Sequence, residues 1–275
     1  MAVPKYLIAA IIAVFAIVWR FLSYEQSYPL HYAVENGHID TVITLLGKNV
    51  DVNIKDIDDL APLHRASEFG HADIAELLLE KGADVNIRGK FNRTPLISAS
   101  IRGHTNVGRV LLEKGADVNL KDSNGYTALQ WALSENSIEL AVIILENGAD
   151  FNIKGHGGAT PLHWASNVGN IQIASLLLQK GADINIQDED GYSALHWSAI
   201  QGNIEIARIL LEGGAELNIK SNLGQTPLHI TSHIGNVDMT RFFIGKGADI
   251  SIKDNNGQAP VDGVTDDKIR ALYYV

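Results

Sequence analysis

The sequence predicts an all-α fold of stacked helix-turn-helix units, and three regularities indicate it. A leucine recurs every 33 residues without insertion or deletion, from Leu30 and Leu63 to Leu228, and Val261 takes the next position. Six of the seven prolines directly precede this position. A glycine also recurs in phase, at Gly70, Gly103, Gly169, Gly202 and Gly235. A fixed period of this size is typical of one supersecondary unit repeated many times.

The first helix of each unit is indicated by its start and its end. In the unit around Leu162, Thr160 is a good N-cap, and Pro161 suits the first helical position because its missing N–H would be unpaired there. Gly169 then ends the helix in a left-handed conformation. Asn136 replaces this glycine once and tolerates the same conformation.

The second helix follows directly and is amphipathic. In residues 170–181, Ile171, Ala174, Leu177 and Leu178 form one apolar stripe, and Gly181 caps the end. A turn rich in Asp, Asn and Gly, such as residues 121–126, then leads into the next unit.

These motifs resemble ankyrin repeats: Thr-Pro-Leu-His, the glycine after the first helix, and the run Leu-Leu-Leu-x-x-Gly-Ala-Asp-x-Asn. The resemblance covers residues 27–275 and implies an ankyrin-repeat solenoid. We expect seven repeats starting near residues 27, 61, 94, 127, 160, 193 and 226, and a C-terminal half repeat at 259–275. The first and last units depart from the pattern, as capping repeats do.

Residues 1–26 are a separate N-terminal segment and short linker. The run from Tyr6 to Trp19 is apolar, and Leu22 ends its continuation beyond Arg20. As one helix, residues 6–22 would span about 25 Å, slightly less than the ~30 Å hydrocarbon core of a bilayer. We expect a single membrane anchor, with the repeats on the exported side because Lys5 precedes the run. A cleaved signal peptide, which would give a secreted protein, and a buried core helix are the alternatives.

Composition excludes several classes of function. The chain has 22 basic and 32 acidic residues, whereas nucleic-acid binders are usually basic. It contains no cysteine, which removes disulfides and thiolate chemistry. No catalytic or phosphate-binding motif occurs, so we expect no enzyme activity, no cofactor and no small-molecule substrate.

Histidines recur at the same spacing, and we consider whether they could form a metal site. They stand at His31, His64, His163, His196 and His229. Equivalent side chains in stacked units lie roughly 10 Å apart, too far to share one ion. We therefore expect these histidines to form hydrogen bonds at the start of the first helix, and no metal site.

The residue after this histidine position varies and carries three of the four tryptophans, Trp131, Trp164 and Trp197. Tryptophan is enriched in binding hot spots, so this ladder is a candidate contact surface. The alternative is that the indoles pack between first helices, and an indole can do both.

The turn tips also vary, and by resemblance they border the concave face that holds partners. Aromatic tips at Phe91, Tyr126 and Tyr192, and basic ones at Arg88, Lys90 and Arg93, are further candidate contacts. We therefore expect a membrane-tethered, non-enzymatic scaffold that binds a protein on its concave face. The alternative is a secreted effector or enzyme inhibitor.

Overall fold

The computed structural model describes residues 24–274, and its regular structure is helical. Within this range no β-strand forms, and only two isolated bridges occur, Lys121 with Thr127 and Gln187 with Ser193. The described residues fall into two compact units, one ending at Asp117 and one beginning at Val118. We call them unit 1 (24–117) and unit 2 (118–274), and the predicted all-α class is confirmed for both.

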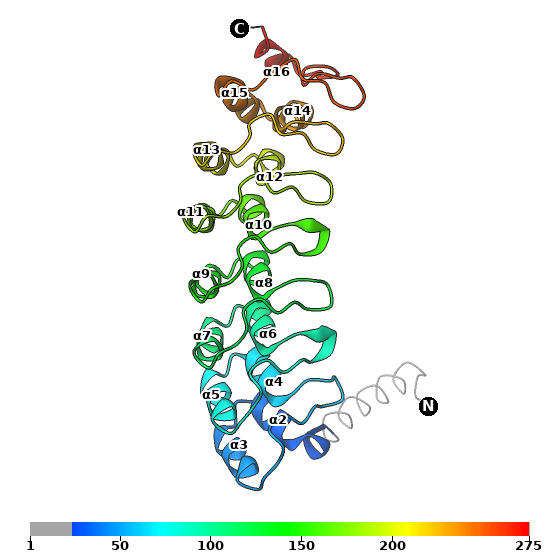
Figure 1. Ribbon diagram of the computed structural model, residues 1–275. Coiled ribbons are helices and arrows are strands. Elements are labelled where there is room, and N and C mark those ends of the chain that lie inside the picture. Colours follow the sequence, from blue (N-terminus) through cyan, green and yellow to red (C-terminus); the bar gives the residue numbers. More distant parts are fainter. Residues whose placement is uncertain (1–23, 275) are drawn as a thin grey trace, which may run out of the picture. The chain divides into compact units, whose positions relative to one another are not determined.

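Unit 1 contains three helix pairs (Figure 1). In each pair a first helix is followed by an antiparallel second helix, and a loop with a projecting tip leads to the next pair. The pairs are α2 (Pro29–Glu35) with α3 (Ile39–Leu46), α4 (Pro62–Phe69) with α5 (Ala72–Glu80), and α6 (Pro95–Arg102) with α7 (Thr105–Glu113). The tip before α6 forms a short 3-10 turn, η1 (Lys90–Asn92).

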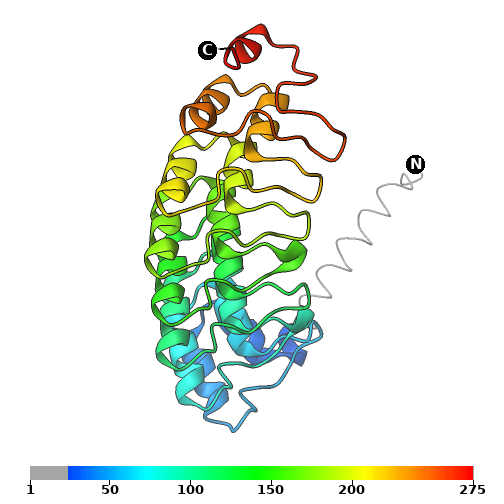
Figure 2. The same ribbon diagram turned by 45° about the horizontal axis from the view of Figure 1, so that its top comes forward.

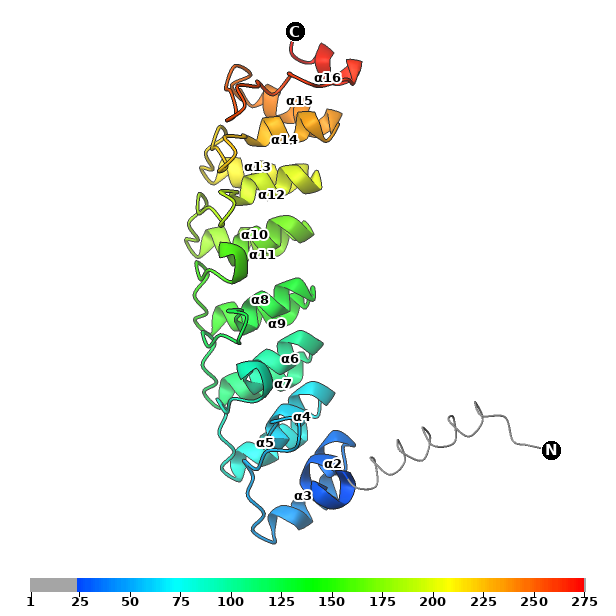
Figure 3. The same cartoon turned by 90° about the vertical axis from the view of Figure 1, so that its right-hand side faces the viewer.

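Unit 2 contains four helix pairs and a final short helix. The pairs are α8 (Ala128–Ser134) with α9 (Ile138–Glu146), α10 (Pro161–Val168) with α11 (Ile171–Gln179), α12 (Ala194–Gln201) with α13 (Ile204–Glu212), and α14 (Pro227–His233) with α15 (Val237–Gly245). A 3-10 turn, η2 (His156–Gly158), precedes α10, and α16 (Asp267–Ala271) follows the last pair. The tips of unit 2 all project to one side of its first helices (Figure 2), and Figure 3 views the unit from that side.

The helix boundaries follow from the residues at the ends. Proline occupies the first turn of α4, α6, α10 and α14, where no N–H bond is lost. The Thr94 hydroxyl accepts the Ile97 N–H at 3.3 Å and caps α6. Gly169 ends α10 with φ 74°, and Asn136 takes the same left-handed conformation after α8 with φ 55°. The predicted role of Asn136 is therefore confirmed.

The core of each unit lies between its first and second helices. Leu63, Leu78 and Leu111 are fully buried in unit 1, as are Leu129 and Leu177 in unit 2. Burying one such side chain contributes about 1.5–3 kcal/mol. The apolar stripes of neighbouring helices therefore account for most of the stability of each stack.

The asparagines of the Gly-Ala-Asp-x-Asn run connect successive repeats. Asn53 Oδ1 accepts the backbone N–H of Asp84 at 2.9 Å, and Asn152 Oδ1 accepts that of Asp183 at 2.9 Å. The same bond recurs along both units. These amides satisfy backbone donors that the loops would otherwise leave to solvent.

The predicted single-pass membrane localisation is corrected by the structure. Among residues 24–274, no helix combines the length and apolar character that crossing a bilayer requires. The apolar helix predicted for residues 6–22, including Tyr6, Trp19 and Leu22, lies outside the described residues. Membrane attachment therefore forms no part of the function derived below.

Candidate interaction surface

The three repeated tryptophans lie in the first half of α8, α10 and α12 and are half-buried. Trp164 and Trp197 have ring centroids 6.3 Å apart. Tyr126 lies beside them, 5.3 Å from Trp131 and 6.3 Å from Trp164, with both rings edge-on. We call Tyr126, Trp131, Trp164 and Trp197 the aromatic row. Each ring packs with one side and leaves another accessible, so packing and binding are both open to it.

The indole N–H groups of the row have different partners. Trp131 Nε1 donates to Asp122 Oδ2 at 3.0 Å, and Trp197 Nε1 donates to Asp188 Oδ2 at 2.9 Å. Trp164 Nε1 is buried and has no hydrogen-bond partner among residues 24–274. The reason is that Gly155 occupies the position that Asp122 and Asp188 hold in the neighbouring repeats.

An aspartate could not simply be placed at position 155. A Cβ on Gly155 would lie 2.5 Å from the Gln130 amide nitrogen, well inside normal contact. Gln130 in turn is held in place, because its Nε2 donates to the Ala159 carbonyl at 3.1 Å. A side chain at position 155 would therefore require the Gln130 amide to move.

Exposed apolar side chains continue the surface beyond the indoles. Val168, Ile200 and Ile234 are 40%, 41% and 54% exposed and lie three or four residues after the aromatic-row position on α10, α12 and at the end of α14. Side chains at this spacing share a helix face. We call these three residues the apolar strip. Together with the aromatic row it adds apolar area to the first helices of unit 2, which also expose Gln201 and His233.

Tyr192 is the remaining predicted contact in unit 2. Its ring packs on His196, with centroids 5.3 Å apart, and its carbonyl oxygen is bonded to His163 Nε2 at 2.9 Å. Tyr192 therefore supports the loop before α12. Its ring is half-buried, and a role in binding stays a prediction.

The remaining predicted contacts lie in unit 1, around η1. Phe91 is 55% exposed, and its ring lies 5.7 Å from Lys90 Nζ and 5.3 Å from the Arg93 guanidinium. Arg88 donates to the Asn92 carbonyl at 2.7 Å and so braces the turn. Phe91 has φ 57°, a left-handed conformation that is rare for a bulky residue.

A charged network in unit 1 was missed by sequence reasoning. Asp56 accepts hydrogen bonds from Arg65 Nη2 and the Tyr24 hydroxyl, each at 2.7 Å. The Asp56 side chain is fully buried. Burial opposes its ionisation, but the hydrogen bonds from Tyr24 and Arg65 hold the pKa of Asp56 below its ordinary value. In its own repeat, Arg65 occupies the position that the tryptophans hold in unit 2. This difference is the one sequence signal for the charged network.

The repeated histidines are buried hydrogen-bonding groups. His196 Nε2 lies 3.0 Å from the Gln225 carbonyl of the next tip, and its Nδ1 accepts the Ser193 N–H at 3.1 Å. His64 makes the same pair of bonds with Arg93 and Ala61. Burial lowers the pKa of both histidines to about 4. The uncharged ring therefore joins each first helix to the following tip, as expected from the sequence.

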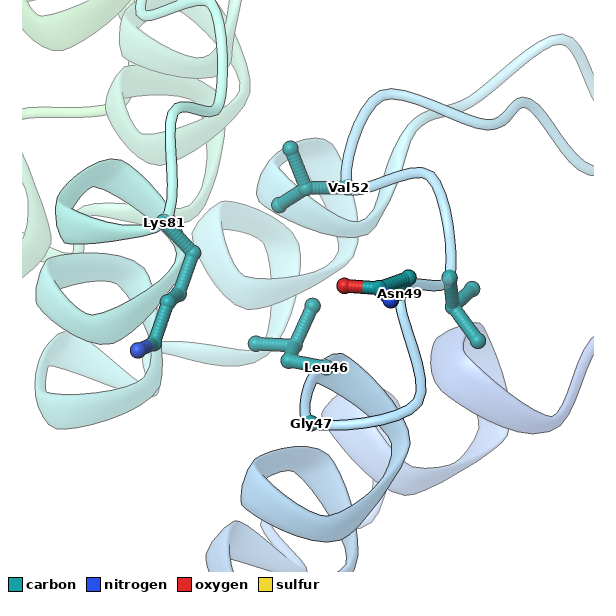
Figure 4. Close-up of a pocket in the computed structure, with 6 residues that line it drawn as sticks. Leu46, Gly47, Asn49, Val52 and Lys81 are labelled. Atoms are coloured by element: carbon teal, nitrogen blue, oxygen red, sulfur yellow. The ribbon is translucent and has the colours of Figure 1, made fainter.

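Two of the cavities are products of the repeat itself. One, of about 510 Å³, lies between the ends of α3 and α5 and is lined by Leu46, Val52 and Lys81 (Figure 4). A second, of about 290 Å³, is lined by Leu211, Leu217 and Lys246, which hold the equivalent positions five repeats later. Because the same groove occurs at equivalent positions in both units, it indicates no specific ligand.

Comparison with known proteins agrees with the helix-pair architecture. A family model of three ankyrin repeats matches residues 7–89, 63–155 and 154–221, and a single-repeat model matches residues 223–255. The chain therefore belongs to the ankyrin-repeat family. Comparison with curated protein sequences gave no match.

A solved structure shares the fold. The human ASB11 ankyrin repeat domain is 28% identical in sequence, with a TM-score of 0.70. The match covers 80% of this chain and 98% of that one. Ankyrin repeats form protein–protein interaction modules, and this chain is a module of that class.

Proposed function

We propose that this ankyrin-repeat protein holds a protein partner against the first-helix face of unit 2, the surface that by resemblance is concave. The observation that carries the proposal is the combination of the aromatic row with the apolar strip on successive first helices. Large aromatic anchors surrounded by smaller apolar contacts are typical of binding hot spots. Val168, Ile200 and Ile234 are 40–54% exposed, so part of their apolar surface is available to a partner.

The net charge of unit 2 indicates what kind of partner segment it would bind. Residues 118–275 contain 10 basic and 18 acidic residues, a difference of −8. Glu135 and the tip residues Glu189 and Asp190 are exposed near the first helices. We therefore expect a partner segment that presents apolar side chains with basic residues beside them, because opposite charges at the rim speed association.

A scaffold role fits this fold better than catalysis. Proteins with ankyrin repeats typically act as non-enzymatic interaction scaffolds. His64 and His196 use both ring nitrogens for structural hydrogen bonds. Such rings are poorly placed to transfer protons to a substrate.

The test uses exposed residues, so that binding is separated from stability. A triple variant, Val168→Ser with Ile200→Ser and Ile234→Ser, should weaken the affinity for a co-purified partner by about tenfold or more. The matched control is Ile171→Ser, because Ile171 is 47% exposed but lies on the second helix α11. The proposal fails if the triple variant binds like the wild type, or if Ile171→Ser weakens binding to the same extent.

A further inference from the structure

Unit 1 contains a charged pocket whose lining is not repeated elsewhere. It has a volume of about 260 Å³ and lies between the first helices α4 and α6 and the tips that precede them. Its walls include Arg65, Ser98 and Arg102, and its rim includes Asp58, Lys90 and Phe91. These positions are the ones at which the repeats differ, in contrast to the grooves between second helices.

The pocket has a simple steric origin. Ser98 stands at the position that Trp131, Trp164 and Trp197 occupy in unit 2, and it is 3% exposed. A hydroxymethyl group fills far less space than an indole, so the surface beside α6 is hollow where the equivalent surface of unit 2 is filled. Because Ser98 is polar and small, the pocket floor also has less apolar area than the equivalent surface of unit 2.

Its charge differs from that of the rest of the chain. Residues 85–112 contain five basic residues, Arg88, Lys90, Arg93, Arg102 and Arg109, and no acidic one. The whole chain has a net charge of −10. Lys90 and Arg102 are exposed at the pocket, and Lys90 Nζ forms an ion pair with Asp58 Oδ1 at 3.4 Å. Arg65 is 13% exposed and paired with Asp56 and Asp58. The pocket lining carries four basic residues, Arg65, Lys90, Arg93 and Arg102, against two acidic ones, Asp58 and Glu68, so its charge is positive.

Apolar side chains are exposed at the rim and beside it. Phe91 on the rim is 55% exposed, and Ile57, which directly precedes the rim residue Asp58, is 73% exposed. Phe91 is held in a left-handed backbone conformation with φ 57°, which is strained for a residue with a side chain. Glycine would avoid this strain at the same position. An exposed, strained aromatic residue beside a basic pocket is the arrangement expected of a ligand contact.

We propose that this pocket binds an acidic segment of a protein, distinct from the segment bound by unit 2. A partner carboxylate meets the ammonium group of Lys90 and the guanidinium group of Arg102. An apolar side chain next to that carboxylate covers Phe91 and Ile57. The inference goes beyond the proposed function because it assigns a second surface with the opposite charge preference.

Glu68 provides an internal competitor for the same cations. Its carboxylate lines the pocket and lies 3.4 Å from Arg65 Nη1. Burial raises the pKa of Glu68, while Arg65 and Arg102 act in the other direction. Neutralising this carboxylate should therefore strengthen the binding of an acidic ligand, whereas neutralising Lys90 or Arg102 should weaken it.

The experiment uses the full chain and a short fluorescent peptide that carries glutamate beside phenylalanine. Fluorescence anisotropy should show that Lys90→Gln and Arg102→Gln each weaken binding roughly fivefold, and that added salt weakens the wild type. Phe91→Asn should also weaken binding, since asparagine keeps the left-handed backbone without the ring. Glu68→Gln should tighten it. Lys48→Gln, which removes an exposed charge of unit 1 outside the pocket, should have no effect.

Several results would overturn the proposal. The proposal fails if the wild-type chain does not bind the peptide, or if Lys48→Gln and Arg102→Gln weaken peptide binding equally. It also fails if Glu68→Gln does not tighten peptide binding. Displacement of the peptide by single-stranded DNA at lower concentration would show a nucleic-acid site instead. Val168→Ser should leave peptide binding unchanged. A failure of the proposed pocket in unit 1 is therefore distinguishable from a failure of the proposed surface on unit 2. Each variant is first checked for wild-type helicity by circular dichroism, and Arg102→Gln is decisive because Arg102 is exposed.

Discussion

The indole N–H of Trp197 is hydrogen-bonded to the carboxylate of Asp188 at 2.9 Å, and this bond is absent one repeat earlier. Trp164 has an equally placed indole, but no residue in the range 24–274 accepts its proton. The difference results from glycine at position 155, where the neighbouring repeats have aspartate. The two tryptophans therefore make a natural comparison between a bonded and an unbonded indole on the same surface.

Replacing each indole by phenyl should separate packing from hydrogen bonding. Trp164→Phe and Trp197→Phe remove the same volume, but only Trp197→Phe leaves the Asp188 Oδ2 atom without this donor. We expect Trp197→Phe to lower the free energy of unfolding by about 1–2 kcal/mol more than Trp164→Phe does. Urea unfolding followed by circular dichroism measures both values. Equal losses would show that the Asp188 bond contributes nothing to stability.

Removing all three indoles tests whether the aromatic row binds as well as packs. A variant with alanine at Trp131, Trp164 and Trp197 should lose partner affinity and also melt at a lower temperature, because half-buried rings serve both purposes. Partner affinity is measured well below the melting temperature of the variant. Unchanged affinity together with reduced melting would show that the row is purely structural.

The buried histidines predict how stability depends on pH. His64 and His196 have pKa values of about 4 in the folded chain against an ordinary value of 6.5. Below pH 6.5 the unfolded chain therefore binds protons that the folded chain does not. Stability should be fully present above pH 6.5 and should fall as the pH drops toward 4, by at most about 1.4 kcal/mol per pH unit for each such histidine.

The chain itself supplies the control for this prediction. Gln130 occupies the histidine position in its repeat and makes both equivalent bonds, accepting from the Thr127 N–H at 3.0 Å and donating to the Ala159 carbonyl at 3.1 Å. His196→Gln should therefore keep the structure while reducing the pH dependence between 6.5 and 4. Urea unfolding at a series of pH values measures the slope, and an unchanged slope would contradict the assignment.

The Arg65–Asp56 pair should be important for the stability of unit 1. Arg65→Leu leaves the fully buried Asp56 carboxylate without its cation, although the Tyr24 hydroxyl remains. We expect a loss of roughly 2–4 kcal/mol in the stability of unit 1, measured by hydrogen exchange of its amides. Lys55→Gln breaks the exposed Lys55–Asp59 pair and should change stability by less than about 1 kcal/mol. Similar effects of the two variants would contradict the central place of Asp56.

The helix pairs could be predicted from sequence because their signals are local. Thr160 and Pro161 start a helix, Gly169 ends it, and Ala174 and Leu177 of the predicted apolar stripe are buried, so each repeat is largely specified by its own residues. Ile171 of that stripe is 47% exposed, and α11 buries Ile173 instead. The division into two units at residue 117 could not be predicted, because the period of 33 continues through it unchanged.

The candidate surfaces were predicted only in part. The position of the tryptophans was correct because it follows from the period, but their acceptors were missed. Asp122 and Asp188 lie nine residues before the indoles that they bind. The repeat between them has Gly155 at the same position, so the aspartate is not a constant feature of the period. The pocket at Ser98 was missed because it depends on the absence of a large side chain, which has no sequence motif.

We propose that the first-helix face of unit 2, and not its second-helix face, holds the partner. A photo-crosslinking amino acid placed at Val168 or Ile200 samples the first-helix face, and one placed at Gln172 or Glu205 samples exposed positions on α11 and α13. After irradiation of the complex, mass spectrometry identifies which positions have formed partner adducts. We expect adducts at Val168 and Ile200 and none at Gln172 and Glu205. Adducts confined to Gln172 and Glu205 would contradict this proposal.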